Sequence, residues 1–150
     1  NDLNDEQMAN VRLNNIGFVF QSFNLIAPLN VEENVMLPLT LQKVAKKDAL
    51  PRVLKALDLL GMTHRLKSLP KMLSGGEQQR VAVARALINK PAIIFADEPS
   101  GNLDTASAEN LHQLFFKLRD ELGQTFVIVT HNEDLANMAD RKLIMVDGLI

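Results

Sequence analysis

The sequence predicts an α/β fold built on a parallel sheet, with a helical segment inserted into it. Three short apolar runs have the length of strands: Ile16–Phe20, Ala92–Ala96 and Phe126–Val129. Uniformly apolar strands that alternate with helical patterns are typical of a parallel sheet covered on both faces by helices. A mainly helical stretch, from about Val31 to Leu73, interrupts this alternation and is expected to form an insert.

The first half of the chain is expected to hold one strand and two helices. The polar run Asn1–Asn10 leads into the first strand and is not expected to form a unit of its own. Val31–Leu41 predicts a short helix broken at Pro38, because proline lacks the backbone N–H that a helix needs. Asp48–Leu60 carries apolar residues on one helical face, and Gly61 is a natural helix stop.

The second half is expected to alternate helices with strands. Gly75–Asn89 predicts a well-buried helix, because its alanines leave little room for a polar face. An apolar stripe from Leu111 to Leu122 predicts a further helix, which Asp104 or Thr105 could cap. Three short elements are expected to end the chain: a helix over Glu133–Ala139, a strand over Leu143–Val146 and a turn at Asp147–Gly148.

The composition is that of a globular domain with a hydrophobic core. Of the 150 residues, 47% are apolar and 23% are charged, as in soluble globular proteins. The net charge of −2 gives no argument for binding to nucleic acid or to an anionic membrane surface. The lack of cysteine excludes disulfides and thiolate metal sites, and it fits a reducing cytoplasm. No apolar run approaches the roughly 20 residues of a membrane span, so any role at a membrane is expected to need a partner.

The run Leu73–Arg80 (LSGGEQQR) is a candidate phosphate site. A serine and two glycines directly before a helix place free backbone N–H groups at the positive end of the helix dipole. Glycine also lets the backbone approach a phosphate without a side chain in the way. The alternative is an ordinary helix N-cap followed by a helix-favouring Glu77.

Two adjacent acids, Asp97 and Glu98, end the apolar strand in the run IIFADEP. Ligands bind at the carboxyl ends of strands in open α/β sheets. Successive side chains on a strand point in opposite directions, so one acid can position Mg²⁺ while the next accepts a proton from a water that attacks a phosphate. The alternative is a solvated strand end with two carboxylates in a turn.

Two further polar side chains follow predicted strands. His131, after Thr130, could donate a hydrogen bond to a phosphate oxygen or orient the attacking water. Gln21 could bind a metal ion or water through its amide. Taken singly, a structural histidine and a surface glutamine are the alternatives.

The order of these motifs closely resembles the nucleotide-binding domain of ABC transporters. A glutamine after a strand, a helical insert, LSGGEQQR, AIIFADEP, SGNLD and TH correspond to the Q-loop, the signature motif, Walker B, the D-loop and the H-loop. The resemblance covers the chain from Gly17 to its end. It implies a P-loop NTPase-type (RecA-like) core, with an α-helical subdomain formed by about residues 31–73 and the start of the signature helix.

The resemblance implies ATP and Mg²⁺ as cofactors and assigns a role to each motif. The signature residues would contact the γ-phosphate of ATP held by an opposite subunit, and Ser100–Asp104 would cross the dimer interface. The implied site residues are Glu98 and His131 in catalysis, Gln21 and Asp97 at the metal, and Gln21, Ser74, Gly75, Gly76, Gln78 and Asp104 in nucleotide binding.

One motif of the family does not occur in the chain: the glycine-rich Walker A loop with its lysine. That loop supplies most contacts to the β- and γ-phosphates. Because Asn1 is not a start residue, the chain is expected to be a fragment whose N-terminal part, Walker A included, lies upstream. The fragment alone is expected to bind ATP weakly and to be inactive, whereas the full-length subunit is expected to be an ATPase.

Within the family the chain resembles most the lipoprotein-releasing (LolD) and macrolide-exporter (MacB) ATPases, through IGFVFQSFNLIAPLNVEENVMLPL, DEPSGNLD and GQTFVIVTHNEDLA. This implies a head-to-tail homodimer with a second ATPase subunit, integral membrane partner subunits and no nucleic acid. It also implies a peripheral place on the cytoplasmic face of the inner membrane. The alternatives are a non-transport ABC ATPase and a regulatory fragment without hydrolysis.

An apolar patch near the Q-loop is expected to receive the membrane partner. Leu25, Ile26, Leu29 and Met36 lie in a region too short to bury all of them. Some of them are therefore expected to be exposed, which a lone domain normally avoids.

Overall fold

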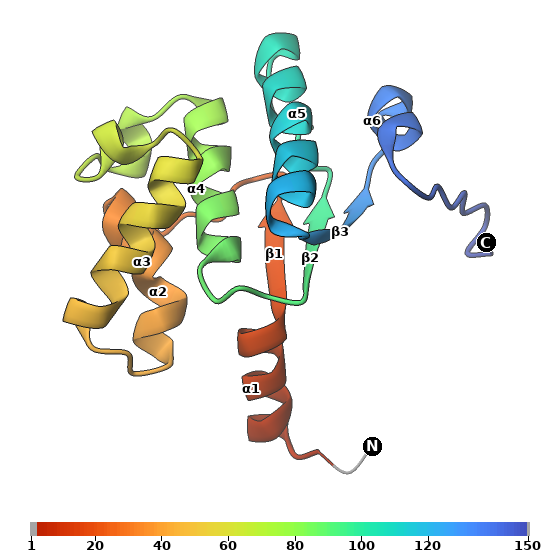
Figure 1. Ribbon diagram of the computed structural model, residues 1–150. Coiled ribbons are helices and arrows are strands. Elements are labelled where there is room, and N and C mark those ends of the chain that lie inside the picture. Colours follow the sequence, from red (N-terminus) through yellow and green to blue (C-terminus); the bar gives the residue numbers. More distant parts are fainter. Residues whose placement is uncertain (1–2, 150) are drawn as a thin grey trace.

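The computed structural model describes residues 3–149 and has a parallel sheet at its centre. The sheet has the order β1-β2-β3, from strands Ile16–Phe20, Ile93–Asp97 and Thr125–Val129. In the register of the three strands, Gly17 pairs with Ile94 and Ile94 pairs with Phe126. The three strands predicted from apolar runs are thereby confirmed, and their carboxyl ends meet at one edge of the sheet (Figure 1).

Helices occupy both connections between the strands, and one more lies before the first strand and one after the last. The α-helices are α1 (Asp5–Asn15), α2 (Val31–Leu41), α3 (Lys46–Leu59), α4 (Gly75–Leu87), α5 (Thr105–Leu122) and α6 (Glu133–Met138), and short 3-10 turns lie at Thr63–Arg65 and Pro70–Met72. Figure 1 shows α2, α3 and α4 gathered on one side of the strands, with α6 and the C-terminal segment on the other. No helix among residues 3–149 is long and apolar enough to cross a membrane.

Local sequence signals fix where these helices begin and end. Ser74 caps α4 in a capping box with Glu77, and Asn30 caps α2 in the same way with Glu33. Between the two caps considered for α5, the structure has Asp104, whose side chain accepts a hydrogen bond from the backbone of Ser107. Each cap satisfies N–H groups that the first turn of a helix leaves without an intrahelical partner.

The hydrophobic core lies between one face of the sheet and the helices. Val19, Ile94 and Ala96 point to this face and are almost fully buried. Helix α4 lies close against β1 because the strand has a glycine at position 17. A Cβ built on Gly17 would lie only 2.8 Å from the carbonyl oxygen of Ala86 in that helix. The buried side chains, which alternate along the strands, therefore face α4 and α5.

The other face of the sheet remains exposed in the described part of the chain, so the expectation of a sheet covered on both faces is wrong there. Phe18 is 45% exposed and stacks on Phe20 and Phe95, with ring centroids 5.9 and 5.8 Å apart. Strand β3 is only partly buried, since Val127 and Val129 are exposed while Phe126 and Ile128 pack against the core. The reason is geometric: alternate residues of a strand point to opposite faces, and the helices cover one of them.

Two further expectations about helices are corrected. Helix α2 continues through Pro38, because a proline removes only one backbone bond and the flanking Val35 and Leu39 are completely buried. The polar start of the chain is not without structure, since α1 forms there behind a capping box of Asn4 and Gln7. This helix buries none of its residues, so its sequence has no apolar stripe from which a helix could be predicted.

The end of the chain differs from the expected strand. Leu143–Val146 is not a β-strand, and its four apolar side chains are 59–67% exposed. Strand residues need a neighbouring strand for their backbone hydrogen bonds, and none lies beside this segment among the described residues. The turn at Asp147–Gly148 is confirmed, with φ of +50° and +79° and a bridge between Val146 and Leu149.

The apolar patch predicted near the Q-loop is smaller than expected. Met36 is only 8% exposed and belongs to the core, and Leu25 packs against that core. Ile26 is 42% exposed. Asn34 holds this loop, since its buried side chain bonds both the N–H and the carbonyl of Ile26. The exposed part of the patch is therefore Ile26 rather than Met36.

Candidate functional site

The candidate site is built at the carboxyl ends of β2 and β3. Strand β2 ends at Asp97, and the next residue, Glu98, has a φ of +42°. Few non-glycine residues adopt this left-handed conformation, and it costs on the order of 1–3 kcal/mol. A backbone hydrogen bond of 2.8 Å from the Glu98 N–H to the carbonyl of Val129 secures the turn to β3.

The carboxylate of Glu98 is held by residues that follow β3. It accepts a hydrogen bond of 2.8 Å from the backbone N–H of His131 and one of 3.3 Å from the hydroxyl of Thr130. The ring Nε2 of His131 lies 3.5 Å from the same carboxylate, while the histidine side chain is fully exposed. The structure therefore brings the two predicted catalytic residues together and leaves the imidazole open to a ligand.

Asp97 and Gln21 lie at the carboxyl ends of the neighbouring strands β2 and β1. Asp97 pairs with Phe20 in the sheet register, so Gln21 directly follows the partner of Asp97. The amide Nε2 of Gln21 donates to Asn102 Oδ1 at 3.1 Å, and Asn102 Nδ2 donates to the Gln21 carbonyl at 3.1 Å. The Gln21 amide is thus turned toward the loop after β2.

The oxygens of Asp97 and Gln21 suit Mg²⁺ in their chemistry. Mg²⁺ prefers oxygen ligands and is commonly held by one or two carboxylates together with substrate phosphates and water. Among residues 3–149 no group of three or more acidic, histidine or cysteine side chains could hold a metal by itself. These two residues fit the part of the coordination that a protein supplies when a phosphate ligand brings the rest.

The signature residues lie at the beginning of α4. Ser74 Oγ accepts from the N–H of Glu77 at 3.2 Å, and the Glu77 carboxylate accepts from the N–H of Ser74 at 2.9 Å. This backbone hydrogen bond is the main reason why the pKa of Glu77 lies below its ordinary value, and Arg65 at 3.0 Å lowers it further. The first-turn N–H groups of Gly75 and Gly76 belong to the set without intrahelical partners, which makes them available to an anion.

The start of α4 packs against the start of α5. A Cβ on Gly76 would lie 3.2 Å from the hydroxyl of Ser107, so glycine permits this approach. Asp104 accepts from the N–H and the hydroxyl of Ser107, at 2.9 and 2.7 Å, and the backbone bond lowers its pKa. The side chain of Gln78 donates to the carbonyl of Leu73 at 3.3 Å. Ser74, Gly75, Gly76, Gln78 and Asp104 thus gather around two adjacent helix N-termini.

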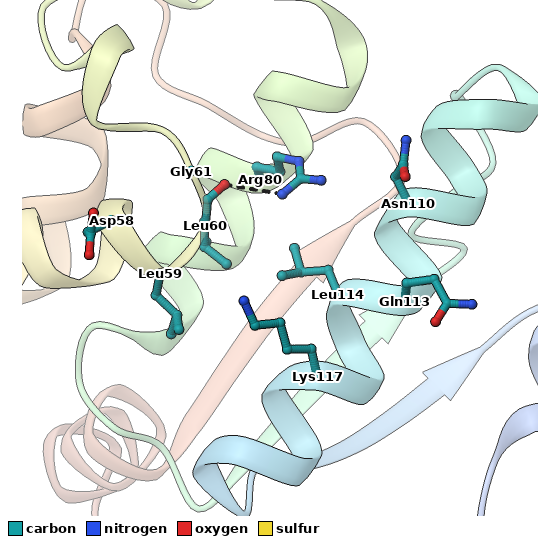
Figure 2. A pocket seen from close by; sticks show the side chains of 9 residues that line it. All are labelled: Asp58, Leu59, Leu60, Gly61, Arg80, Asn110, Gln113, Leu114 and Lys117. Atoms are coloured by element: carbon teal, nitrogen blue, oxygen red, sulfur yellow. Dashed lines mark hydrogen bonds between the residues drawn. The ribbon is translucent and has the colours of Figure 1, made fainter.

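A separate pocket of about 560 Å³ lies between the end of α3 and the outer side of α5 (Figure 2). Arg80 points into it from α4 and donates to the carbonyl of Leu60 at 3.1 Å, and Lys117 extends across it from α5. None of the residues predicted for the site lines this pocket. This pocket is therefore separate from the residues predicted to carry the chemistry.

Sequence reasoning missed three residues that connect these parts. Thr130 supports Glu98, Asn102 holds Gln21, and the completely buried Gln79 of α4 reaches the ends of both β1 and β2. All three lie within or next to motifs assigned from the sequence, which is the only signal that could have pointed to their contacts. Their partners lie 20 to 81 residues away along the chain, so a single sequence does not reveal the contacts.

Comparisons with known proteins agree with this arrangement. Residues 1–101 match the family described as ABC transporter. The chain is 56% identical over 148 residues to the lipoprotein-releasing system ATP-binding protein LolD of Cytophaga hutchinsonii, and 55% identical to LolD of Bacteroides thetaiotaomicron. These alignments cover 99% of this chain and 68% of each relative.

Solved structures agree with the sequence relatives. The dimeric structure of a bacterial ABC transporter cassette superposes with a TM-score of 0.84 at 43% identity, and the match covers 99% of this chain and 66% of that one. A second dimeric structure of an ATP-binding cassette, in a post-hydrolysis state bound to ADP and Pi, also gives a TM-score of 0.84, at 42% identity and with the same coverage. The chain therefore belongs to the ABC transporter family of ATP-binding, ATP-hydrolysing cassettes, and it is similar over nearly its whole length to the lipoprotein-releasing ATPases.

Proposed function

We propose that this chain supplies the catalytic acid–base and signature residues of an ATPase subunit that works as a head-to-tail homodimer beneath a membrane transporter. The observation that carries the proposal is the restraint of Glu98 by Thr130 and the His131 backbone at the carboxyl edge of the sheet. A carboxylate fixed at this edge can accept a proton from a water that attacks a γ-phosphate.

The proposed roles follow from the positions of the side chains. Glu98 takes the proton from the attacking water, and its bonds to Thr130 and His131 hold it in one orientation. His131 presents an exposed imidazole that can donate a hydrogen bond to a phosphate oxygen. Asp97 and Gln21 would hold Mg²⁺, which when bound supplies positive charge against the phosphate oxygens.

The signature residues are proposed to act on a nucleotide held by the second subunit. Ser74, Gly75 and Gly76 present a helix N-terminus that favours an anion, and Asp104 and Gln78 lie beside it. The dimeric arrangement of a solved cassette similar to this chain supports the pairing. In a head-to-tail dimer, each nucleotide would lie between Glu98 of one copy and Ser74 of the other.

The helical part of the chain is proposed to couple hydrolysis to a membrane subunit. Residues 31–73 and the start of α4 would form the helical subdomain, and the exposed Ile26 lies on the loop that leads into it. The identity to lipoprotein-releasing ATPases supports a role in lipoprotein release from a peripheral place on the cytoplasmic face of the membrane. These relatives also favour transport over an ABC ATPase acting on nucleic acid and over a regulatory protein without hydrolysis.

A mixing experiment in the intact subunit tests this function. Ser74→Arg removes the signature function and Glu98→Gln removes the base, so each variant alone is expected to lose ATP hydrolysis. In a mixed dimer one of the two sites has wild-type Ser74 and Glu98, and hydrolysis should return on mixing. A wild-type subunit without ATPase activity would refute the proposed function. Mixtures that stay as inactive as the separate variants would show that the two residues do not share a site.

A further inference from the structure

Gln79 is the completely buried polar residue that joins α4 to the ends of two strands. Its amide Nε2 donates at 3.0 Å to the carbonyl of Phe20 and also to the carbonyl of Pro99. The side chain has no exposed surface, and its Oε1 has no hydrogen-bond partner. A buried amide that donates hydrogen bonds to two separate backbone segments fixes those segments relative to its own helix.

The two carbonyls flank the residues assigned to the chemistry. Phe20 immediately precedes Gln21, and Pro99 immediately follows Glu98. Phe20 is also the register partner of Asp97, so the amide of Gln79 lies across the ends of β1 and β2. At the other end of the link, Gln79 lies five residues beyond Ser74, which is about 7.5 Å along the helix axis.

We infer that Gln79 is a positioning residue that ties the signature helix to the catalytic edge of the same subunit. This inference rests on the proposed function. Because α4 is a continuous helix, a displacement of its Ser74 end is carried to Gln79 and through the two carbonyls to the backbone beside Gln21 and Glu98. A nucleotide bound at the signature end thereby biases the orientation of the catalytic carboxylate in the chain that carries it.

A second side chain of α4 holds the same loop farther on. Arg85 donates to the carbonyls of Phe23 and Asn24, at 3.0 and 2.7 Å. Both loop residues have positive φ, +64° and +52°, so the loop takes a bent course that these bonds stabilise. Gln79 and Arg85 together fasten the backbone on both sides of Gln21 to one helix, which makes independent motion of that loop unfavourable.

The test replaces Gln79 by methionine in the intact subunit and compares it with Gln124→Met. Methionine has a similar length and volume without N–H donors, so it removes the hydrogen bonds and keeps the packing. Gln124 is a matched control, since it is also buried and donates to two carbonyls, those of Pro91 and Thr125, at the opposite end of the sheet. Thermal unfolding, kcat and the KM for ATP are measured for both variants.

Gln79→Met is expected to lower kcat about a hundredfold, the typical cost of a misplaced reacting group, while KM changes little. Gln124→Met is expected to lower the Tm without this loss of kcat. Wild-type kcat in Gln79→Met, or an equal loss in both variants, would overturn the inference. An inactive wild-type subunit would instead indicate failure of the proposed function.

A measurement on the wild-type subunit covers the case in which Gln79→Met does not fold. The side-chain amide resonances of Gln79 are expected to shift when MgATP is added, while those of Gln124 stay in place. Unchanged Gln79 resonances at saturating MgATP would overturn the inference.

Discussion

The backbone N–H of His131 donates a 2.8 Å hydrogen bond to the carboxylate of Glu98, beyond the carboxyl ends of the paired strands β2 and β3. The two residues are 33 positions apart in sequence. Glu98 directly follows the end of β2, and His131 is the second residue after the end of β3. Parallel pairing places both carboxyl ends at one edge, so the sheet itself creates the contact. The bond orients the Glu98 carboxylate, which we propose as the general base.

Glu98→Gln is expected to stop turnover while ATP binding remains. The amide keeps an oxygen that can accept from His131 but cannot take a proton, and a general base typically contributes about 10²–10⁴-fold to the rate. Steady-state hydrolysis and nucleotide binding in the intact subunit measure the two effects separately. Glu121→Gln, an exposed acid on α5, is the control and should hydrolyse ATP normally. Turnover near wild type in Glu98→Gln would mean that another group is the base.

Ser74→Ala and Asn30→Ala are expected to cost similar stability but to differ in activity. Both residues are N-caps in a capping box, and loss of a cap typically costs about 1 kcal/mol. Urea unfolding should give comparable decreases in the free energy of unfolding. ATP hydrolysis should fall in Ser74→Ala only, since Asn30 caps α2 and is not among the proposed site residues. Equal activity in the two variants would show that Ser74 acts only as a helix cap and not in hydrolysis.

The capping box at α4 should make stability sensitive to acid. The hydrogen bond from the Ser74 N–H lowers the folded-state pKa of Glu77 below its ordinary value of 4.5. The stabilisation is complete above about pH 4.5, and it is lost as the pH falls through the lower pKa of the folded state. Unfolding curves collected from neutral pH downward should show a smaller acid-induced loss for Glu77→Gln than for the wild type. An identical pH dependence would show that the carboxylate contributes nothing.

His112 should give a pH effect of the same sign at a higher pH. Its ring Nε2 lies 2.9 Å from the hydroxyl of Ser100, and burial lowers its pKa below the ordinary 6.5. The unfolded chain therefore binds a proton first, so the free energy of unfolding falls as the pH drops below about 6.5 toward the folded-state pKa. His112→Gln keeps a polar partner for Ser100 and should flatten this part of the stability profile. A profile that stays as steep as that of the wild type would contradict the assignment.

Ile26→Ala is expected to weaken assembly with the membrane subunits without a marked change in stability. Ile26 is 42% exposed in the loop between β1 and α2, whereas Met36 belongs to the core. Met36→Ala should instead destabilise the fold by about 2–5 kcal/mol, as deletions in a core do. Co-purification with the membrane subunits and thermal unfolding distinguish the two effects. Leu41→Ala, at an exposed site at the end of α2, serves as the control and should assemble normally.

Much of the fold could be predicted because its signals are local. Apolar runs gave the three strands, and Ser74 and Gly61 marked a helix start and a helix end. Pro38 misled because its local cost is small beside the burial of Val35 and Leu39. The strand expected at Leu143–Val146 failed for the reverse reason, since a strand requires a neighbour and sequence pattern alone cannot supply one.

The sequence by itself determined the family, the order of the motifs and the residue types at each strand end, because these are properties of short segments. The tertiary structure decided which of these segments touch. Three sets of hydrogen bonds join residues far apart in the chain. Thr130 and His131 donate to Glu98, Gln21 donates to Asn102, and Gln79 donates to two backbone carbonyls. Such contacts depend on the parallel register of the strands and on the approach of α4 to β1, and distances between segments are set by packing of the whole core.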